Sequence, residues 1–324
     1  MKIYGVLCII VGIMMLVCPL ASIPYNGNKS SDTEKMTEIE TNNTSKTSDD
    51  TISVFMSNEN QIEEMDMRQY IIGTVAAEMP ASYNSEALKA QALAAITFAE
   101  YQKINNNDSL NGADISDNSN THQGYMSKSE MQEKWGDTYE TYYEKIADAV
   151  DEVIDEVIVY NGKPIMAAYH AISTGKTESA ENVWGKSVPY LISVDSEGDK
   201  YSSRYSSTVT FTENELKEAV KSKVKNPTES EDGIIINETT DSGTVSSVTV
   251  FGEKLTGMEL RNLLSLRSPS FDVSYKNGEY LFTVKGYGHG VGMSQYGADW
   301  YAKQGYTYKE IISHYYPETT IEQR

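Results

Sequence analysis

The sequence predicts an α+β fold for the 324-residue chain, with an N-terminal transmembrane helix and a disordered tether before the folded part. Three observations predict it. The chain opens on a long uncharged apolar segment, helical periodicities concentrate in the first part of the predicted domain, and short β-like runs broken by turns fill its later part. We expect an anchor over residues 1–24, a linker over 25–51, and a single extracytoplasmic domain over 52–324 that combines a helical hairpin with mixed β-strands.

Composition excludes one broad class of partner. The chain carries a formal net charge of −20 at pH 7, and no stretch gathers the lysine and arginine needed to neutralise a phosphate backbone. The hydrophobic fraction of 39% is sufficient for a folded core. We therefore expect a folded protein that does not bind nucleic acid.

The N-terminal apolar segment runs from Ile3 to Ile23 and comes directly after one charged residue, Lys2. About 20 apolar residues span a bilayer, whereas the apolar region of a cleaved signal peptide has only ~7–15. We favour an uncleaved anchor, and a signal peptide cut near residues 19–22 is the alternative. A single span at the N-terminus predicts a single-pass protein of the cell membrane, with the bulk of the chain outside the cytoplasm.

Both cysteines, Cys8 and Cys18, lie inside the apolar segment. Lipidation is disfavoured, because Val17 precedes Cys18 where lipoprotein processing prefers a small residue. The predicted domain therefore has no thiol, and with it neither a disulfide nor a thiolate metal ligand.

Polar residues make up most of positions 25–50, a composition that does not repay the entropy of ordering. An alternating stretch over 51–55 predicts the first strand of the domain. A helix is predicted over residues 67–79, where apolar residues recur at helical spacing and Pro80 ends the helix. An alanine-rich helix is predicted next, over 85–103, and the two form the expected hairpin.

Turn-rich sequence predicts a long surface loop over residues 105–123, and a third helix is expected over 138–154. A second loop insertion or hinge is expected over the acidic and polar segment 223–242. The remaining short runs predict strands over 157–160, 164–170, 188–194, 245–250 and 280–284.

Glu78 is the first candidate for chemistry. It lies on the apolar stripe of the predicted 67–79 helix, near the C-terminus of that helix. Desolvation and the negative end of the helix dipole both raise the pKa of a carboxyl group placed there. A carboxyl that stays protonated near neutral pH can act as a general acid. The alternative is a glutamate that only reaches solvent at the edge of a helix.

The segment 286–297 alternates four glycines around His289 and continues to Ser294 and Gln295. Alternating glycine can leave the backbone open for a ligand to approach. The alternative is a tight strand-turn in which His289 hydrogen-bonds the backbone. The glycine spacing does not match the phosphate-binding motifs.

Hydroxyl, imidazole and indole groups gather in the segments 169–177 and 182–185. Sugars stack on aromatic rings and hydrogen-bond to polar side chains, so this composition suits sugar recognition. A serine hydrolase using Ser173 or Ser294 is an alternative, but the chain has no Gly-x-Ser-x-Gly elbow to support it. The candidate residues here are Tyr169, His170, Ser173, Thr174 and Trp184.

In this order, the segments 70–80, 86–92, 169–177, 183–185 and 286–297 resemble the family of stage II sporulation protein D and the related amidase enhancers. The resemblance implies a lytic transglycosylase that acts on peptidoglycan strands already stripped of their stem peptides, and Glu78 matches the catalytic glutamate. No cofactor is implied. By position in the matched motifs, the residues expected to bind sugar are Tyr169, His170, Ser173, Thr174, Trp184, His289, Ser294 and Gln295.

In the implied reaction, the acid protonates the oxygen between N-acetylmuramic acid and N-acetylglucosamine. The muramoyl C6 hydroxyl then closes onto C1 to give a 1,6-anhydro end, and no water enters the product. An internal nucleophile explains why the sequence offers no second carboxylate to pair with Glu78, as ordinary glycosidases require.

The resemblance also implies a setting and partners. The setting is septal wall remodelling during engulfment of the forespore, and the partners are stage II sporulation proteins P and M. A non-catalytic wall-binding protein that recruits or stimulates an amidase is the main alternative.

One departure from the family concerns the loop 105–123. Some relatives carry a zinc site of histidine and cysteine there, whereas this loop has His122 and no cysteine. A lone histidine with Asp114 or Asp117 is too little for a closed tetrahedral site, so we expect no metal.

Overall fold

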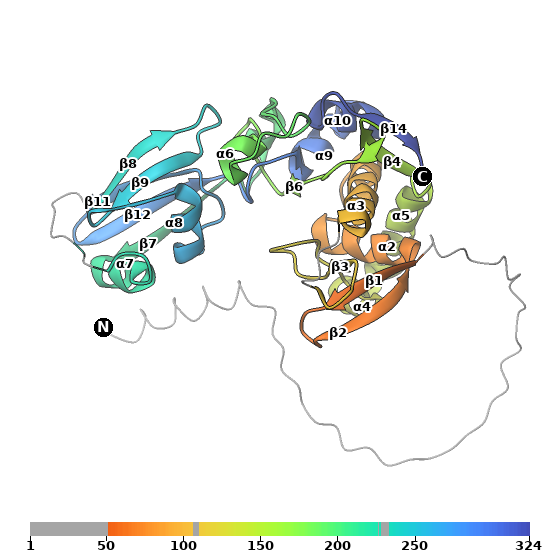
Figure 1. The fold of residues 1–324 in the computed structure, drawn as a ribbon, viewed down its shortest axis with the longest axis horizontal. Coiled ribbons are helices and arrows are strands. Elements are labelled where there is room, and N and C mark those ends of the chain that lie inside the picture. Colours follow the sequence, from red (N-terminus) through yellow and green to blue (C-terminus); the bar gives the residue numbers. More distant parts are fainter. Residues whose placement is uncertain (1–50, 106–109, 226, 228–232) are drawn as a thin grey trace, which may run out of the picture. The chain divides into compact units, whose positions relative to one another are not determined.

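The computed structural model describes residues 51–324 except 106–109, 226 and 228–232 (Figure 1). The predicted anchor over 1–24 and the predicted linker up to residue 50 lie outside the described residues. In the part that is described, no helix is both long enough and apolar enough to cross a membrane. Helices and mixed sheets alternate along it, which confirms the α+β prediction.

Helices make up much of the described chain, and two of them, η3 and η4, are short 3₁₀ segments. In chain order, the described helices are α2 (Met67–Glu78), α3 (Ser85–Asn105), α4 (Lys128–Trp135), η3 (Gly136–Thr138), α5 (Tyr139–Asp151), α6 (Ala180–Trp184), η4 (Glu197–Tyr201), α7 (Glu213–Val220), α8 (Gly257–Leu264), α9 (Gln295–Lys303) and α10 (Tyr308–Tyr315).

The strands of the described residues form five small sheets, with the strand orders β2-β1-β3, β14-β4-β5, β13-β6, β11-β12-β7 and β10-β9-β8. Their bounds are β1 (Thr51–Met56), β2 (Gln61–Asp66), β3 (Ile115–Ser116), β4 (Glu156–Tyr160), β5 (Lys163–Pro164), β6 (Tyr169–His170), β7 (Ser206–Thr212), β8 (Ile234–Thr239), β9 (Val245–Val250), β10 (Glu253–Leu255), β11 (Phe271–Lys276), β12 (Glu279–Lys285), β13 (Met293–Ser294) and β14 (Thr320–Gln323).

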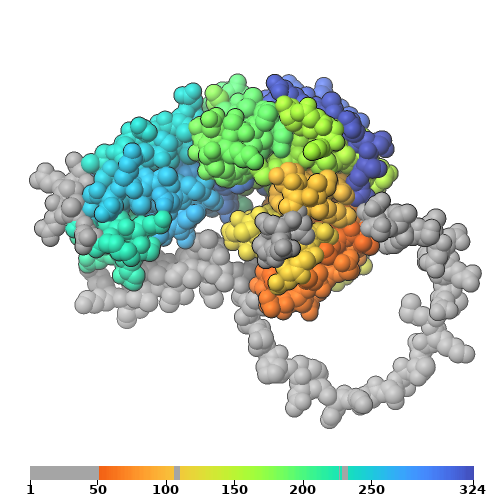
Figure 2. All heavy atoms as spheres, viewed as in Figure 1, coloured from red at the N-terminus to blue at the C-terminus, as the bar shows by residue number. Residues whose placement is uncertain are grey.

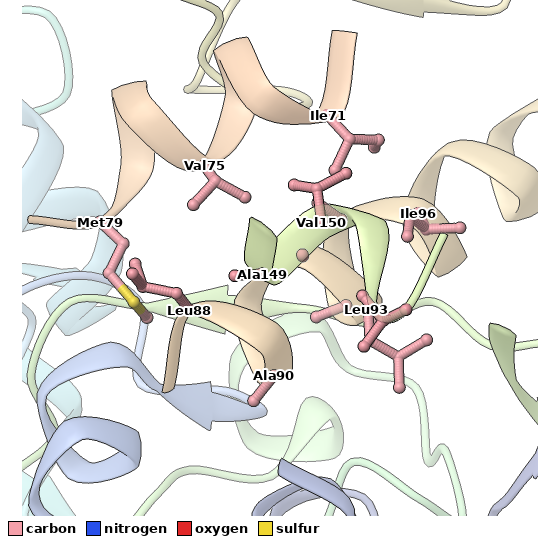
Figure 3. Close-up of a cluster of buried hydrophobic side chains, with 14 of the residues drawn as sticks. Ile71, Val75, Met79, Leu88, Ala90, Leu93, Ile96, Ala149 and Val150 are labelled. Atoms are coloured by element: carbon pink, nitrogen blue, oxygen red, sulfur yellow. The ribbon is translucent and has the colours of Figure 1, made fainter. Parts of the chain in front are cut away.

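The predicted helical hairpin is the centre of the first hydrophobic core. Helix α2 begins where Asp66 accepts a hydrogen bond from the backbone nitrogen of Gln69, and it ends just before Pro80. Helices α2, α3 and α5 then pack together through aliphatic side chains (Figure 3). This packing fixes the C-terminal end of α2, which carries Glu78.

Helix α3 is buried on most of its circumference because it contacts α2, α5, α9, α10 and β4. Alanine suits such a position, since small side chains let several neighbours approach the same helix closely. Helix α3 also contacts the short strands β3 and β5. The polar residue Gln91 is fully buried among them.

A second hydrophobic core lies between α7, α8 and the two three-stranded sheets that contain β7 to β12. The prediction of a loop over 223–242 is wrong for its last part, because Ile234–Thr239 forms strand β8. Ile234 and Ile236 alternate with outward-facing residues and pack against this core. The acidic residues shortly before Ile234 led to the prediction of a loop, although the β-branched run from Ile234 to Ile236 is typical of a strand.

Three other predictions need correction. Residues 188–194 form no strand; they include a turn at residues 189–190 and hydrogen-bond to Thr177 through the backbone of Val194. The run 164–170 is divided between β5 and β6. The loop 105–123 contains the short strand β3, which pairs in parallel with β1.

Candidate active site

Glu78 is the last residue of α2 and is half-buried. The backbone nitrogen of Gly124 donates a 2.6 Å hydrogen bond to its Oε1. Burial raises the pKa of Glu78, and the hydrogen bonds from Gly124 and from the Gln295 side chain only partly oppose this. The carboxyl therefore holds its proton to a higher pH than an exposed glutamate does.

Gln295 comes from the other end of the chain, at the start of α9, and is buried. Its Nε2 donates to Oε1 of Gln91 in α3 at 3.3 Å. The Nε2 of Gln91 is buried and has no hydrogen-bond partner among the described residues. The amide pair thus joins the helical hairpin to α9 beside Glu78. Gln91 escaped the sequence analysis, although a glutamine in an alanine and leucine helix was a signal that could have found it.

The charge of Glu78 affects the pKa of two tyrosines, Tyr70 and Tyr169. Burial raises the pKa of Tyr70 and of Tyr169, and the negative charge of Glu78 adds to both shifts. The Tyr70 hydroxyl donates to Oε1 of Gln123 at 3.1 Å. The Tyr169 hydroxyl is buried and makes no hydrogen bond of normal geometry in the described part of the chain, although the Gln123 side chain is close enough to lower its pKa.

Tyr169 is placed by β6, which pairs in parallel with β13. The glycine-rich segment leading to β13 lies against residues 168–178, and its four glycines, 286, 288, 290 and 292, have positive φ. A Cβ on Gly288 would stand 2.8 Å from Cβ of His170, and one on Gly292 would stand 2.0 Å from the carbonyl oxygen of Ala168. The glycines therefore allow close approach by the protein's own backbone.

His170 and His289 are held against this segment. Nδ1 of His170 donates to the carbonyl oxygen of Val291, and Nδ1 of His289 accepts from the nitrogen of Val291, both at 3.1 Å. Burial lowers the pKa of His170 to about 3, with a further contribution from His289. Burial and then the charge of Arg261 lower the pKa of His289 to about 4. Both imidazoles are neutral at neutral pH and act as hydrogen-bonding groups.

Trp184 ends the short helix α6, and its side chain is 44% exposed. Its ring lies 5.5 Å from that of His289, which in turn lies 5.8 Å from that of His170. Three of the predicted sugar-binding residues thus form a row of rings, in the order Trp184, His289 and His170. Figure 2 shows the green residues near 160–200 against the blue C-terminal residues. Between these parts of the chain, Nε2 of His314 donates to the carbonyl oxygen of Asp195 at 2.6 Å.

The three predicted hydroxyl residues make contacts within the protein. Asp199 is fully buried and accepts from the backbone nitrogen of Ser173 at 2.8 Å and from the Ser294 hydroxyl at 2.7 Å. Ser294 also caps α9, and the Thr174 hydroxyl donates to the carbonyl oxygen of Ser242 at 2.5 Å. These contacts hold the segments around Ser173 and Ser294 together through buried hydrogen bonds. Asp199 escaped the sequence analysis because no local pattern marks it.

The same contacts argue against a serine hydrolase. Ser173 Oγ accepts from the nitrogen of Gly175, and Ser294 Oγ is engaged by Asp199. His170 and His289 instead hydrogen-bond to the backbone of Val291. Neither serine is therefore bonded to a histidine that could take its proton.

The loop 105–123 is held by β1 in its described part. Oδ2 of Asp114 accepts from the nitrogen and the hydroxyl of Ser53, at 2.9 and 2.7 Å. Nδ1 of His122 hydrogen-bonds with the Thr121 hydroxyl at 3.1 Å. Across the described ranges, no three histidine, cysteine, aspartate or glutamate side chains converge on one point.

Comparison with known proteins identifies the family. A family model described as "Stage II sporulation protein" matches residues 56–160, which include Glu78 and Gly124. Stage II sporulation protein D of Bacillus subtilis (strain 168) is 38% identical over 329 residues, covering 98% of this chain and 94% of that protein. The chain belongs to the stage II sporulation protein D family.

Two further relatives show how far the family extends. Stage II sporulation protein D of Bacillus amyloliquefaciens is 36% identical and covers 84% of this chain and 78% of its own length. A protein named amidase enhancer, from Bacillus subtilis (strain 168), is 30% identical over 77% of this chain but only 40% of its own length. The family name confirms the resemblance to a sporulation protein.

Proposed function

We propose that this protein is a membrane-anchored peptidoglycan lytic transglycosylase. It cleaves the linkage between N-acetylmuramic acid and N-acetylglucosamine in peptide-stripped strands and leaves 1,6-anhydro ends. The observation that carries the proposal is Glu78, a half-buried carboxyl with a raised pKa, held by the Gly124 backbone on a packed helix. A general acid needs a proton and a fixed position; the raised pKa favours the first, and the hydrogen bond from Gly124 supports the second.

The proposed step uses one carboxyl group twice. Glu78 gives its proton to the glycosidic oxygen as the bond from that oxygen to the muramoyl C1 breaks. The muramoyl C6 hydroxyl bonds to C1, and its proton returns to the Glu78 carboxylate. In this scheme the internal C6 hydroxyl replaces the second carboxylate that ordinary glycosidases use.

Polar groups around Glu78 fit a sugar substrate. The Tyr169 hydroxyl and Nε2 of Gln91 are buried donors without partners in the described structure. Buried donors are costly when unsatisfied, so a ligand that accepts hydrogen bonds gains by meeting them. Sugar hydroxyls and acetamido carbonyls are such acceptors.

The cellular setting is proposed from the family. The apolar segment over residues 1–24 would hold the protein in the membrane, with the described domain outside the cytoplasm. Its substrate would be septal peptidoglycan during sporulation. Stage II sporulation proteins P and M would be its partners, with protein P removing the stem peptides first.

A non-catalytic role in stimulating an amidase is the second candidate, and the relative named amidase enhancer favours it. Such a protein binds glycan without needing an ionisable group at position 78. Replacement of Glu78 by glutamine keeps the size of the side chain and removes the proton. The transglycosylase therefore predicts that Glu78→Gln abolishes activity, whereas the amidase-stimulating protein predicts that its action is unchanged.

The test is to incubate the full chain with amidase-treated peptidoglycan and analyse the products by mass spectrometry. The wild type, Glu78→Gln and a control, Glu64→Gln, are compared; Glu64 is an exposed glutamate on β2. Anhydro-muramoyl ends from the wild type and the control alone are the expected result. Reducing ends would show hydrolysis instead. If none of the three forms gives products while all bind glycan, the amidase-stimulating role is the better description.

A further inference from the structure

A hollow of about 450 Å³ lies beside Trp184, at the end of the row of rings formed by His170, His289 and Trp184. It is lined by Tyr101, Met166, Trp184, Lys186 and residues 187–190. The hollow is large enough for a single sugar ring, whereas the pocket beside His289 and Lys176 has a volume of only about 10 Å³. Of these two spaces, only the hollow can take a substituent of the glycan.

Aromatic rings form fixed walls of this hollow. Trp184 is followed by Gly185, whose left-handed conformation ends α6 and turns the chain into the segment that lines the hollow. Tyr190 is held by a hydrogen bond from the nitrogen of Met166 to its hydroxyl (3.1 Å), and its ring lies 5.5 Å from that of Tyr160. A partly exposed indole beside a fixed phenol ring is a stacking surface for the apolar face of a sugar.

Lys186 is the only charged residue among those that line the hollow. It is exposed, and within the described residues it has no ion-pair partner. The chain as a whole carries a net charge of −20, which disfavours the approach of anions overall. An unpaired cation in an aromatic hollow is a local exception, and it suits a ligand that combines a sugar face with one negative charge.

We propose that the hollow binds a muramoyl residue whose stem peptide has been removed, with Trp184 stacking on the sugar and Lys186 pairing with the free lactyl carboxylate. The proposal rests on the proposed function for its substrate class. In an intact strand the lactyl carboxyl is an amide and carries no charge, whereas the amidase product carries a carboxylate. Lys186 would therefore give the protein its selectivity for stripped strands.

Binding in the absence of cleavage provides the test. The full chain carrying Glu78→Gln is titrated with peptide-stripped glycan strands and with the same strands after their lactyl carboxylates have been converted to amides. Lys186→Gln is added, with Lys186→Arg as the charge-preserving variant and Lys254→Gln as the control. Lys254 is an exposed lysine on β10 that lines neither pocket.

We expect the free acid to bind about tenfold more tightly than the amide, the size of effect typical of one charge-assisted contact. Lys186→Gln should abolish this preference, Lys186→Arg should restore most of it, and added salt should weaken it. Trp184→Ala should weaken the binding of both ligands. An acid preference that survives in Lys186→Gln, or no preference in any form, would overturn the proposal. Because these titrations require no turnover, their outcome is separate from that of the cleavage assay.

Discussion

The backbone nitrogen of Gly124 lies 2.6 Å from Oε1 of Glu78, so the chain after the 105–123 loop sets the position of the candidate acid. A Cβ at position 124 would stand 3.0 Å from that same oxygen and 3.3 Å from Cβ of Ala77. The absence of a side chain at position 124 is therefore what lets the backbone reach the carboxyl.

Gly124→Ala should consequently lower the rate of glycan cleavage while leaving the fold intact. The carboxyl must shift by a few tenths of an ångström, and small errors in the position of a catalytic group are costly; we expect a loss of about tenfold. The rate of formation of anhydro ends and the thermal midpoint are measured together. An unchanged rate would show that the position of the carboxyl tolerates this shift.

The pH dependence of cleavage should track the pKa of Glu78. A general acid works protonated, so activity falls as pH rises through its pKa. The Gln295 amide lowers that pKa, so Gln295→Leu should raise it and move the falling limb of the pH profile to higher pH. Gln132→Leu is the control, because Gln132 is an exposed glutamine on α4 and is not among the groups that shift the pKa of Glu78. A limb that moves to lower pH in Gln295→Leu would contradict this assignment.

Asp199 should make the free energy of unfolding decrease as pH rises through its raised pKa. Burial raises its pKa from 3.8 to about 6, so the folded state binds the proton more tightly than the unfolded state does. Stability is therefore lost between about pH 4 and pH 6, by up to about 3 kcal/mol for two pKa units. The difference between wild type and Asp199→Asn, measured by urea unfolding across this range, isolates the contribution of Asp199. A constant difference would exclude a raised pKa.

Gly292 should be among the least replaceable residues of the domain. Its φ is 72°, and a Cβ would stand 2.0 Å from the carbonyl oxygen of Ala168. Gly292→Ala should cost more than about 3 kcal/mol, because it combines backbone strain with a clash against backbone. Gly278→Ala is the matched control, with a φ of 85° and open space around the Cβ, and should cost only about 1 kcal/mol. Equal losses in urea unfolding would show that the contact with Ala168 relaxes freely.

The loop 105–123 should depend on Asp114 rather than on a metal ion. Asp114→Ala removes the acceptor of two hydrogen bonds from Ser53 and should cost about 1–2 kcal/mol. A chelator should leave the thermal midpoint of the wild type unchanged. A midpoint that falls on chelation and recovers with zinc would show that a metal holds this part of the protein.

Local signals predicted the helical hairpin closely. The helix predicted over 67–79 is observed as Met67–Glu78, and the one predicted over 85–103 as Ser85–Asn105. Both are long enough to display periodicity and end at clear signals. The raised pKa of Glu78 was also predictable from its place on an apolar stripe, and burial is its main cause.

Four short helices were missed although the chain marks their beginnings. Each begins with a capping box, in which a serine or threonine and a glutamate three residues later hydrogen-bond to each other's backbone nitrogens. Eight residues give barely two helical turns, too few to show a hydrophobic periodicity. The four pairs are Ser127 and Glu130 in α4, Thr212 and Glu215 in α7, Thr256 and Glu259 in α8, and Thr307 and Glu310 in α10.

The partners of the site residues were beyond the reach of sequence patterns. Gln295 contacts Gln91, which is 204 residues away, and Asp199 joins two serines, one well before it and one well after it in the chain. Such pairs are fixed by tertiary packing and leave no local trace in a single sequence. The glycines of 286–292 are a second example. Their alternation is visible in the sequence, but the sequence does not show that they lie against the backbone of residues 168–178.

The pairing of Gln91 with Gln295 also bears on when the protein becomes active during its own synthesis. The helix that bears Glu78 is made early, whereas α9 is among the last elements to be made. Early segments fold before late ones arrive, so a growing chain would hold Glu78 without the amide that helps to set its pKa and without β13 to order Tyr169. If the proposed lytic activity depends on this arrangement, a chain that lacks α9 and β13 should be unable to cleave glycan.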